Sequence, residues 1–260
     1  MHNCKIRILE VFAQGGEIYR KCFLFLVALS AIGSGSGIFL EHFLGRSYLL
    51  QVLTAGIDFW ISITSIRLCL RFLEEKAPPK SFQAIVAMPW GKFFRAFVNG
   101  VLAYLLSFAL PFIVLLSAPV YLRMTSNPVT AMLGGIIFLV LAAALIPFSV
   151  WLSIRLSLAD VVALAESTDQ GWWTVKRSWK LMRPPHAWQG FLLALIILMV
   201  MAPGMALFIM AHTYIATGHP QVANGWLYVL GVLGMILAAP LITTTKAAFY
   251  KTLCNEEQTA

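Results

Sequence analysis

The sequence predicts an all-α polytopic membrane protein with six transmembrane helices and three interfacial amphipathic helices. Three observations predict this fold class: the composition, six long apolar runs and a one-sided distribution of cations. Hydrophobic residues make up 60% of the 260 residues and charged residues 12%, whereas soluble domains average about 45–50% and about 25%. A chain this apolar lacks the polar surface that a water-facing globule needs, which excludes a soluble fold.

Six apolar runs are each long enough to cross a bilayer, which takes about 20 residues at about 1.5 Å per residue. None of them alternates in the manner of a barrel strand. The first run is longer than the apolar region of a signal peptide, so we expect an uncleaved span. The runs are Cys22–Leu40, Leu49–Leu70, Phe97–Leu122, Ala131–Ile154, Phe191–Ala211 and Trp226–Ala248.

All but two of the 19 Lys and Arg residues lie on one side of the membrane when the N-terminus is placed inside. The two exceptions are Arg46 and Arg123. Because Lys and Arg concentrate in cytoplasmic loops, we expect both termini in the cytoplasm and the protein in a bacterial inner membrane. The net charge of +8 is then a feature of the inner leaflet, and no nucleic acid is expected as a partner.

Amphipathic segments precede the first, third and fifth spans, at Lys5–Lys21, Ser81–Phe94 and Ser167–Met182. The third segment opens with a capping box, Ser167-Thr168-Asp169-Gln170. We expect its apolar face to carry Trp172, Val175, Trp179 and Met182, and its opposite face to carry Lys176, Arg177, Lys180 and Arg183. Tryptophan opposite cations is typical of a helix that lies in the membrane interface.

Two of these units align with each other. The stretch AFVNGVLAYLL (96–106) matches HAWQGFLLALI (186–196) at an offset of 90 residues. We therefore expect one membrane domain over residues 1–260, built from three parallel repeats at 1–77, 78–164 and 165–260. The alternative is that odd-numbered spans look alike only because each of them leaves a basic loop.

The stretch 155–198 resembles a pattern in bacterial six-helix membrane families. It contains Ser178-Trp179-Lys180-Leu181 in the interfacial helix and then Trp188 at the start of the next span. It is similar to the YciC-like family and to the membrane domain that precedes some glycerophosphodiester phosphodiesterases. The resemblance implies the six-helix architecture and implies no activity.

Asp58 lies near the middle of the second span, where an ionisable side chain is a functional candidate. It could bind a proton or a cation, or it could be a neutral acid that bonds a Ser or Thr of a neighbouring helix. Arg67 and Arg71 share one face of the same helix near the inner boundary. They could hold an anion, or they could only anchor the helix among lipid headgroups.

Two further groups lie at inner span ends. Arg155 and Asp160 flank the end of the fourth span, where we expect an ion pair with another span in preference to a relay. Lys246 follows three threonines near the end of the sixth span, where it could snorkel or line a cavity open to the cytoplasm. Four prolines lie inside spans and are expected to bend them: Pro111, Pro147, Pro203 and Pro240.

No catalytic residue, metal site or cofactor is expected. The four cysteines show no metal-ligand or disulfide spacing, and the chain contains no HExxH, GxSxG or P-loop pattern. The favoured hypothesis is a non-catalytic protein that binds or transports a lipid or an amphiphilic small molecule through a cavity between bent helices. The expected contacts with lipid are made by Trp172, Trp173, Lys176, Arg177, Trp179 and Lys180.

The expected partners are membrane lipids, above all anionic inner-leaflet headgroups, together with a second copy or another membrane protein. The alternative function is a non-catalytic scaffold or subunit of a larger membrane complex. A cavity lined by Asp58 would favour transport, and an Asp58 packed against Ser or Thr would favour the scaffold.

Overall fold

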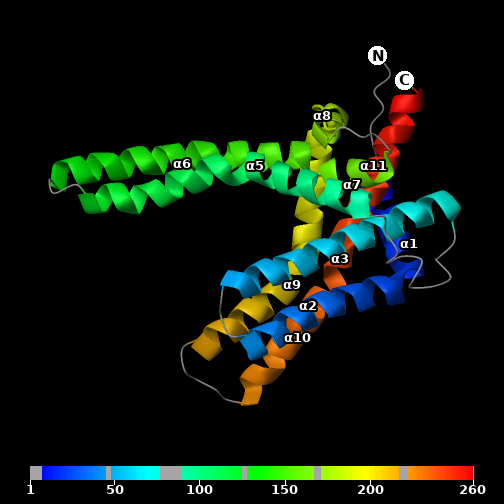
Figure 1. Cartoon of the computed structure of the whole chain (residues 1–260), viewed down its shortest axis with the longest axis horizontal. Helices are drawn as coiled ribbons and strands as arrows, with labels where there is room; N and C mark the ends of the chain where they lie inside the picture. The colour runs from blue at the N-terminus through cyan, green and yellow to red at the C-terminus, as the bar shows by residue number, and fades with distance from the viewer. Residues whose placement is uncertain are drawn as a thin grey trace. The chain divides into compact units, whose positions relative to one another are not determined.

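The computed structural model describes residues 8–44, 48–76, 90–124, 128–166, 171–216 and 222–259. Within these ranges every element is an α-helix, which confirms the all-α prediction. The helices are α1 (Ile8–Lys21), α2 (Phe23–Leu44), α3 (Tyr48–Glu75), α5 (Trp90–Met124), α6 (Pro128–Leu156), α7 (Ala159–Ala165), α8 (Gly171–Leu181), α9 (His186–Ala216), α10 (Val222–Ala238) and α11 (Pro240–Thr259) (Figure 1).

Five stretches of these helices are long and apolar enough to cross a membrane: Val52–Glu75, Gly91–Ala109, Met132–Ala165, His186–Met210 and Trp226–Gln258. A sixth candidate passes the same test only as a pair, α1 with the start of α2, and this pair is bent by 84°. The described residues therefore contain five or six candidate spans. This agrees with the expected multi-pass class and leaves open the status of the first span.

Two of the three expected amphipathic segments form separate helices, α1 and α8. The second segment lies outside the described residues up to position 89, and its last residues open α5. The expected capping box at 167–170 also lies outside them.

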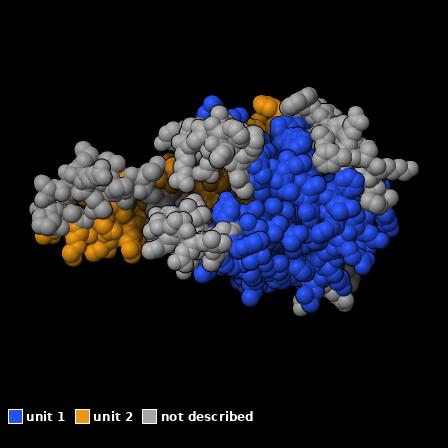
Figure 2. All heavy atoms as spheres, turned by 90° about the horizontal axis from the view of Figure 1, so that it is seen from below, with its two compact units in different colours: residues 1–93, 188–260 blue, residues 94–187 orange. Residues whose placement is uncertain are grey.

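The helices gather into two compact units (Figure 2). Unit 1 comprises residues 1–93 and 188–260, and unit 2 comprises residues 94–187. The expected repeat boundaries remain a prediction, because the two units do not test them.

The core of unit 1 lies where the helices from the two ends of the chain meet. α1 packs against α11, and α3 packs against both α2 and α11 (Figure 1). On α3, the residues from Ile61 to Leu70 are buried apart from Ser62 and Arg67, which are half-buried. The preceding stretch of α3 is mostly exposed, including Leu49 and Val52. The C-terminal half of α3 is therefore packed in the core of unit 1, and much of its N-terminal half is exposed.

Glycines permit the closest helix approaches in unit 1. A Cβ atom at Gly231 of α10 would lie 2.6 Å from the backbone nitrogen of Phe208 in α9, and one at Gly204 would lie 3.2 Å from the carbonyl carbon of Gly234. Gly15 of α1 makes a similar approach to Thr245 of α11, at 3.0 Å from the hydroxyl oxygen. Small residues let helix backbones come this near to each other in membranes.

The sixth span is interrupted by one non-helical residue just before its proline. α10 ends at Ala238 and α11 begins at Pro240, because proline lacks an N–H donor and its ring clashes with the preceding turn. Beside the break, the Tyr19 hydroxyl of α1 donates a hydrogen bond to the Leu237 carbonyl at 2.8 Å. The expected distortion is confirmed at Pro240, whereas α6 and α9 continue as helices through Pro147 and Pro203.

Unit 2 consists of the rest of α5, together with α6, α7 and α8. The rings of Tyr121 on α5 and Phe138 on α6 meet edge to face at 5.5 Å near the turn of this hairpin. At the other end of α6, a short break leads into α7, and α8 packs against both α6 and α7.

Candidate functional site

α8 places tryptophans and cations on the same exposed surface. Its buried residues are Thr174, Val175, Ser178, Leu181 and, just past its end, Met182. Trp172 is 52% exposed and Trp179 is 38% exposed. Lys176, Lys180 and Arg183 are exposed as well, whereas Trp173 and Arg177 are half-buried.

The apolar face expected for α8 is divided in the structure, because Val175 and Met182 are buried whereas Trp172 and Trp179 are exposed. The contact that α8 makes with α6 and α7 is filled by the small Thr174 and Ser178 and by aliphatic side chains. This leaves the bulky indoles outside, next to the lysines. The result is an exposed stripe of Trp172, Lys176, Trp179, Lys180 and Arg183, called the α8 stripe below.

Arg155, in the last turn of α6, forms the main polar contact between α6 and α8. Its guanidinium donates a hydrogen bond from Nη2 to the Trp179 carbonyl at 2.9 Å. In return, the Ser178 hydroxyl donates to the Arg155 carbonyl at 3.0 Å, and this second bond is buried. The two bonds join one turn of α8 to one turn of α6 in both directions.

The same guanidinium lies between two indole rings. Its central carbon is 4.0 Å from the centre of the Trp179 ring and 5.3 Å from that of Trp151. The two rings meet edge to face at 5.3 Å. A cation over an indole face is attracted by the ring quadrupole, by about 2 kcal/mol when both groups are desolvated. Arg155 is only 6% exposed, so we call this cluster the Arg155 clamp.

A second contact joins α7 and α8. Arg177 Nε lies 3.3 Å from Glu166 Oε1, which connects the middle of α8 to the residue that caps α7. Because Arg177 is paired with Glu166, it adds little charge to the exposed surface of α8.

The expected ion pair of Arg155 is absent from the part of the chain that the structure describes. Its guanidinium bonds a backbone carbonyl of α8 in place of a carboxylate. Asp160 lies in the first turn of α7, where its Oδ1 accepts a hydrogen bond from the Val161 amide at 2.9 Å. Sequence reasoning missed this outcome because a backbone acceptor leaves no mark in the sequence.

Asp58 is exposed on the N-terminal half of α3. Its Oδ1 would lie 3.2 Å from a Cβ atom at Gly33, which shows that the carboxylate faces the α2 backbone. Among the described residues it has no hydrogen-bond or ion-pair partner, so the expected bond to a Ser or Thr is not observed. Proton or cation binding at Asp58 remains a prediction.

The other candidate cations lie apart from Asp58. Arg67 and Arg71 are half-buried toward the inner end of α3, and nine residues of helix separate Arg67 from Asp58, or about 13 Å. Lys246 is half-buried on α11. Its threonine neighbours bond their own helix, since the Thr243 hydroxyl donates to the Pro240 carbonyl at 2.8 Å and the Thr244 hydroxyl to the Leu241 carbonyl at 3.2 Å.

One member of the clamp was absent from the sequence-based candidates. Trp151 precedes Arg155 by four residues, and residues with this spacing share a helix face. The four-residue spacing is the sequence signal that could have identified Trp151. It points to a clamp only together with Trp179, which contacts both Trp151 and Arg155.

Within the described ranges, no group of three or more His, Cys, Asp or Glu side chains could hold a metal ion. The long apolar helices are compatible with a multi-pass, all-helical membrane protein, and α8 packs against one of the candidate spans. No protein-family model, curated protein or solved structure matches the chain. The resemblance to the YciC-like family therefore remains a prediction.

Proposed function

We propose that this protein is a non-catalytic, multi-pass protein of a bacterial inner membrane that binds or transports a lipid or an amphiphilic small molecule. The observation that carries the proposal is the α8 stripe. It holds two exposed indoles and two exposed lysines of α8 and, two residues past the helix end, the exposed Arg183, and α8 itself contains no acidic residue.

The chemistry of the stripe suits anionic headgroups of the inner leaflet. Tryptophan prefers the boundary between lipid and water. Each Lys or Arg near an anionic leaflet gains about 1 kcal/mol, so three such cations favour an anionic headgroup over a neutral one by about 3 kcal/mol. The buried hydrogen bond from Ser178 to the Arg155 carbonyl holds the opposite face of α8 against α6, which leaves the stripe on the exposed side.

The route of the amphiphile through the membrane would lie between distorted helices. The interruption of the helix just before Pro240 is the distortion that supports this idea in unit 1. Asp58, on the N-terminal half of α3, would be the polar group that meets the amphiphile or a coupled cation at mid-membrane.

Native mass spectrometry of the gently extracted protein tests the proposal. We expect bound anionic phospholipid, retained in preference to a neutral phospholipid added at equal concentration. A triple variant K176Q/K180Q/R183Q should lose that preference.

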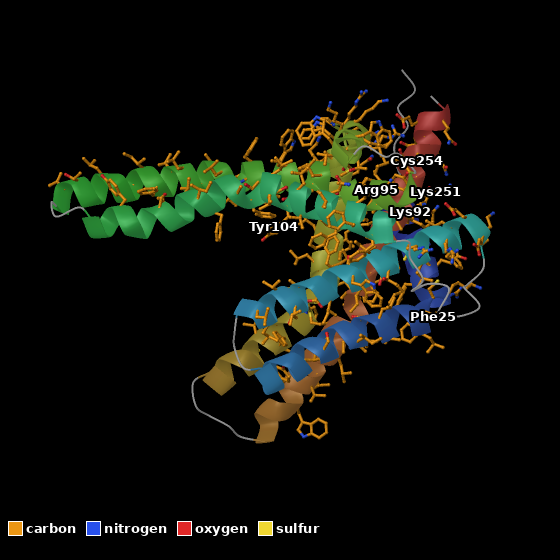
Figure 3. The ribbon with its side chains drawn as sticks, in the orientation of Figure 1. Phe25, Lys92, Arg95, Tyr104, Lys251 and Cys254 are labelled. Carbon is orange, nitrogen blue, oxygen red and sulfur yellow. The ribbon has the colours of Figure 1, made fainter. Side chains whose placement is uncertain are left out.

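The matched control is K21Q/K92Q/K251Q, which removes the same charge from exposed cations of α1, α5 and α11; two of these positions are labelled in Figure 3. The control should keep the preference. Absence of any bound lipid, or an equal loss in both triple variants, would contradict the proposal.

The second candidate function is a scaffold or subunit of a larger membrane complex, with a second copy or another membrane protein as partner. The observation that favours it is the exposed Asp58 carboxylate, which is costly at mid-membrane unless something covers it. Gly35 of α2 and Gly56 of α3 have open space around them, as a closely packed partner helix would need.

An Asp58→Asn substitution separates the two functions. If the scaffold function holds, the native mass spectrum of the wild-type protein shows a stoichiometric protein partner that the variant loses while it keeps its lipid. A wild-type chain that is always observed alone would contradict the scaffold.

A further inference from the structure

The Asp58 carboxylate marks one level of the contact between α2 and α3. A Cβ atom at Gly33 of α2 would lie 3.2 Å from Asp58 Oδ1 and 2.9 Å from Ile61 Cδ1. The two helices pack along each other within unit 1 (Figure 1). Because α2 ends at Leu44 and α3 begins at Tyr48, the short connection makes them antiparallel neighbours.

Three serines lie next to this level. Ser34 follows Gly33 directly on α2, and Ser30 lies one turn before Ser34. Ser62 lies one turn after Asp58 on α3. Side chains four residues apart share a helix face, with about 5–6 Å between their Cβ atoms. One turn back along α2 and one turn forward along α3 lead in the same direction when helices are antiparallel, so Ser30 and Ser62 share the next level.

None of these four polar side chains has a hydrogen bond or an ion pair within the ranges that the structure describes. The carboxylate is exposed and the three serines are half-buried. Nearby hydroxyls behave differently. The Ser36 hydroxyl donates to the Gly33 carbonyl at 2.8 Å, and the Thr64 hydroxyl donates to the Trp60 carbonyl at 2.8 Å. The four oxygen-bearing groups are therefore available to a ligand, whereas their neighbours are satisfied by their own helix.

The chemistry of the four groups suits a cation with one charge. A carboxylate in a membrane span is costly unless it is paired. Carboxylate and hydroxyl oxygens are hard ligands, which favour alkali and alkaline-earth ions over soft transition metals. Asp58 supplies a single negative charge, so a monovalent ion neutralises the site. A divalent ion would leave an unpaired positive charge there, which is itself costly to bury.

We propose that a monovalent alkali cation binds between α2 and α3, held by the side-chain oxygens of Asp58, Ser62, Ser34 and Ser30. The carboxylate supplies the charge, and the hydroxyls replace part of the water shell of the ion. This inference rests on the proposed function, in which Asp58 meets a coupled cation, and adds the class of ion and the residues that bind it.

Equilibrium binding of radiolabelled Na⁺ to the full-length protein in nanodiscs of neutral phospholipid tests the inference. Neutral lipid is chosen because anionic headgroups would attract sodium themselves. We expect saturable binding that unlabelled NaCl displaces. Choline chloride at equal concentration should not displace it, because the hydroxyls cannot coordinate a quaternary ammonium ion. Calcium should compete less well than unlabelled sodium.

Substitutions distinguish the four groups from their neighbours. Asp58→Asn should abolish saturable binding, because it removes the only charge of the site. Ser34→Ala and Ser62→Ala should each raise the Kd for sodium by about tenfold, which corresponds to the loss of one neutral ligand of a charged group. Ser36→Ala is the matched control, since this hydroxyl lies on the same helix as Ser34 and already bonds its own backbone. It should keep the wild-type Kd.

The inference is overturned if the folded wild-type protein shows no saturable sodium binding, or if Asp58→Asn binds sodium as the wild type does. It is also overturned if Ser36→Ala weakens binding as much as Ser34→Ala. Stronger competition by calcium than by unlabelled sodium would overturn the monovalent class. Size-exclusion chromatography identifies any variant that fails to fold, and Asp58→Ser then replaces Asp58→Asn.

The outcome is separable from that of the lipid test. A wild-type protein that retains anionic lipid but binds no sodium would remove this inference and leave the proposed lipid binding intact. A protein that binds sodium at Asp58 but shows no preference for anionic lipid would contradict the role of the α8 stripe and leave the cation site intact.

Discussion

At the scale of single residues, the Arg155 clamp shows how a buried cation can hold an interfacial helix without a carboxylate. The guanidinium donates a hydrogen bond to one backbone carbonyl and lies against two indole rings. Its own carbonyl in turn accepts the Ser178 hydroxyl. A planar guanidinium can stack and donate at once, whereas an ammonium group acts as a strongly hydrated point charge. A lysine at position 155 should therefore hold α8 less well than the native arginine, although it carries the same charge.

We predict that Arg155→Gln loosens α8 without unfolding the protein. A buried hydrogen bond to a charged group contributes about 2 kcal/mol, which corresponds to a roughly 30-fold change in an equilibrium constant. Hydrogen exchange of the amides in α8 should accelerate by about this factor, as measured by mass spectrometry of the peptide covering 171–182. Lys176→Gln, on the exposed face of the same helix, should leave the exchange rate unchanged. Equal acceleration in both variants would refute the role of the clamp.

At the scale of helices, unit 1 depends on glycines at its crossings. α9 and α10 approach so closely that a side chain at Gly231 would collide with the backbone of α9. Backbone atoms cannot move aside as the end of a flexible side chain can. The crossing should therefore tolerate no larger residue, whereas glycines that face open space should tolerate alanine.

We predict that Gly231→Ala lowers the melting temperature of the detergent-solubilised protein by several degrees, because overpacking costs about 1–3 kcal/mol. Gly35→Ala is the control, since a Cβ atom at Gly35 meets nothing within 4 Å. It should leave the melting temperature unchanged or raise it slightly, because alanine favours the helix over glycine by about 1 kcal/mol. If the Gly231→Ala protein has the same melting temperature as the wild type, α9 and α10 separate easily and the crossing is not tightly packed.

Sequence patterns predicted helices better than they predicted helix faces. Hydropathy located the candidate spans, and Pro240 predicted the distortion of the sixth span. On α8, for example, Thr174 and Ser178 read as polar in the sequence, but both are buried in the structure. The Ser178 hydroxyl is satisfied there by a hydrogen bond across to α6. The depth of Asp58 follows from counting residues, but its surroundings depend on packing that counting does not contain.

At the scale of the whole molecule, charge distribution is the strongest guide to orientation. The cations of α8, α1 and the inner ends of α3 and α11 would all lie on one side if the chain follows the positive-inside rule. Only Arg46 and Arg123 would lie on the other side. The excess of +8 would then hold the inner face against anionic lipid, where the α8 stripe is proposed to act.

We predict that residues beside these two arginines are accessible from outside the cell and that the C-terminus is not. In a variant without the native cysteines, Ser47→Cys and Ser126→Cys should react with a membrane-impermeant maleimide in intact inner-membrane spheroplasts. Gln258→Cys should react only after the membrane is permeabilised, because moving the basic inner segments outward would oppose the positive-inside preference. Labelling of Gln258→Cys in intact spheroplasts would place the α8 stripe on the outer leaflet. The preference of that stripe for inner-leaflet headgroups would then have to be abandoned, even if the protein retained lipid.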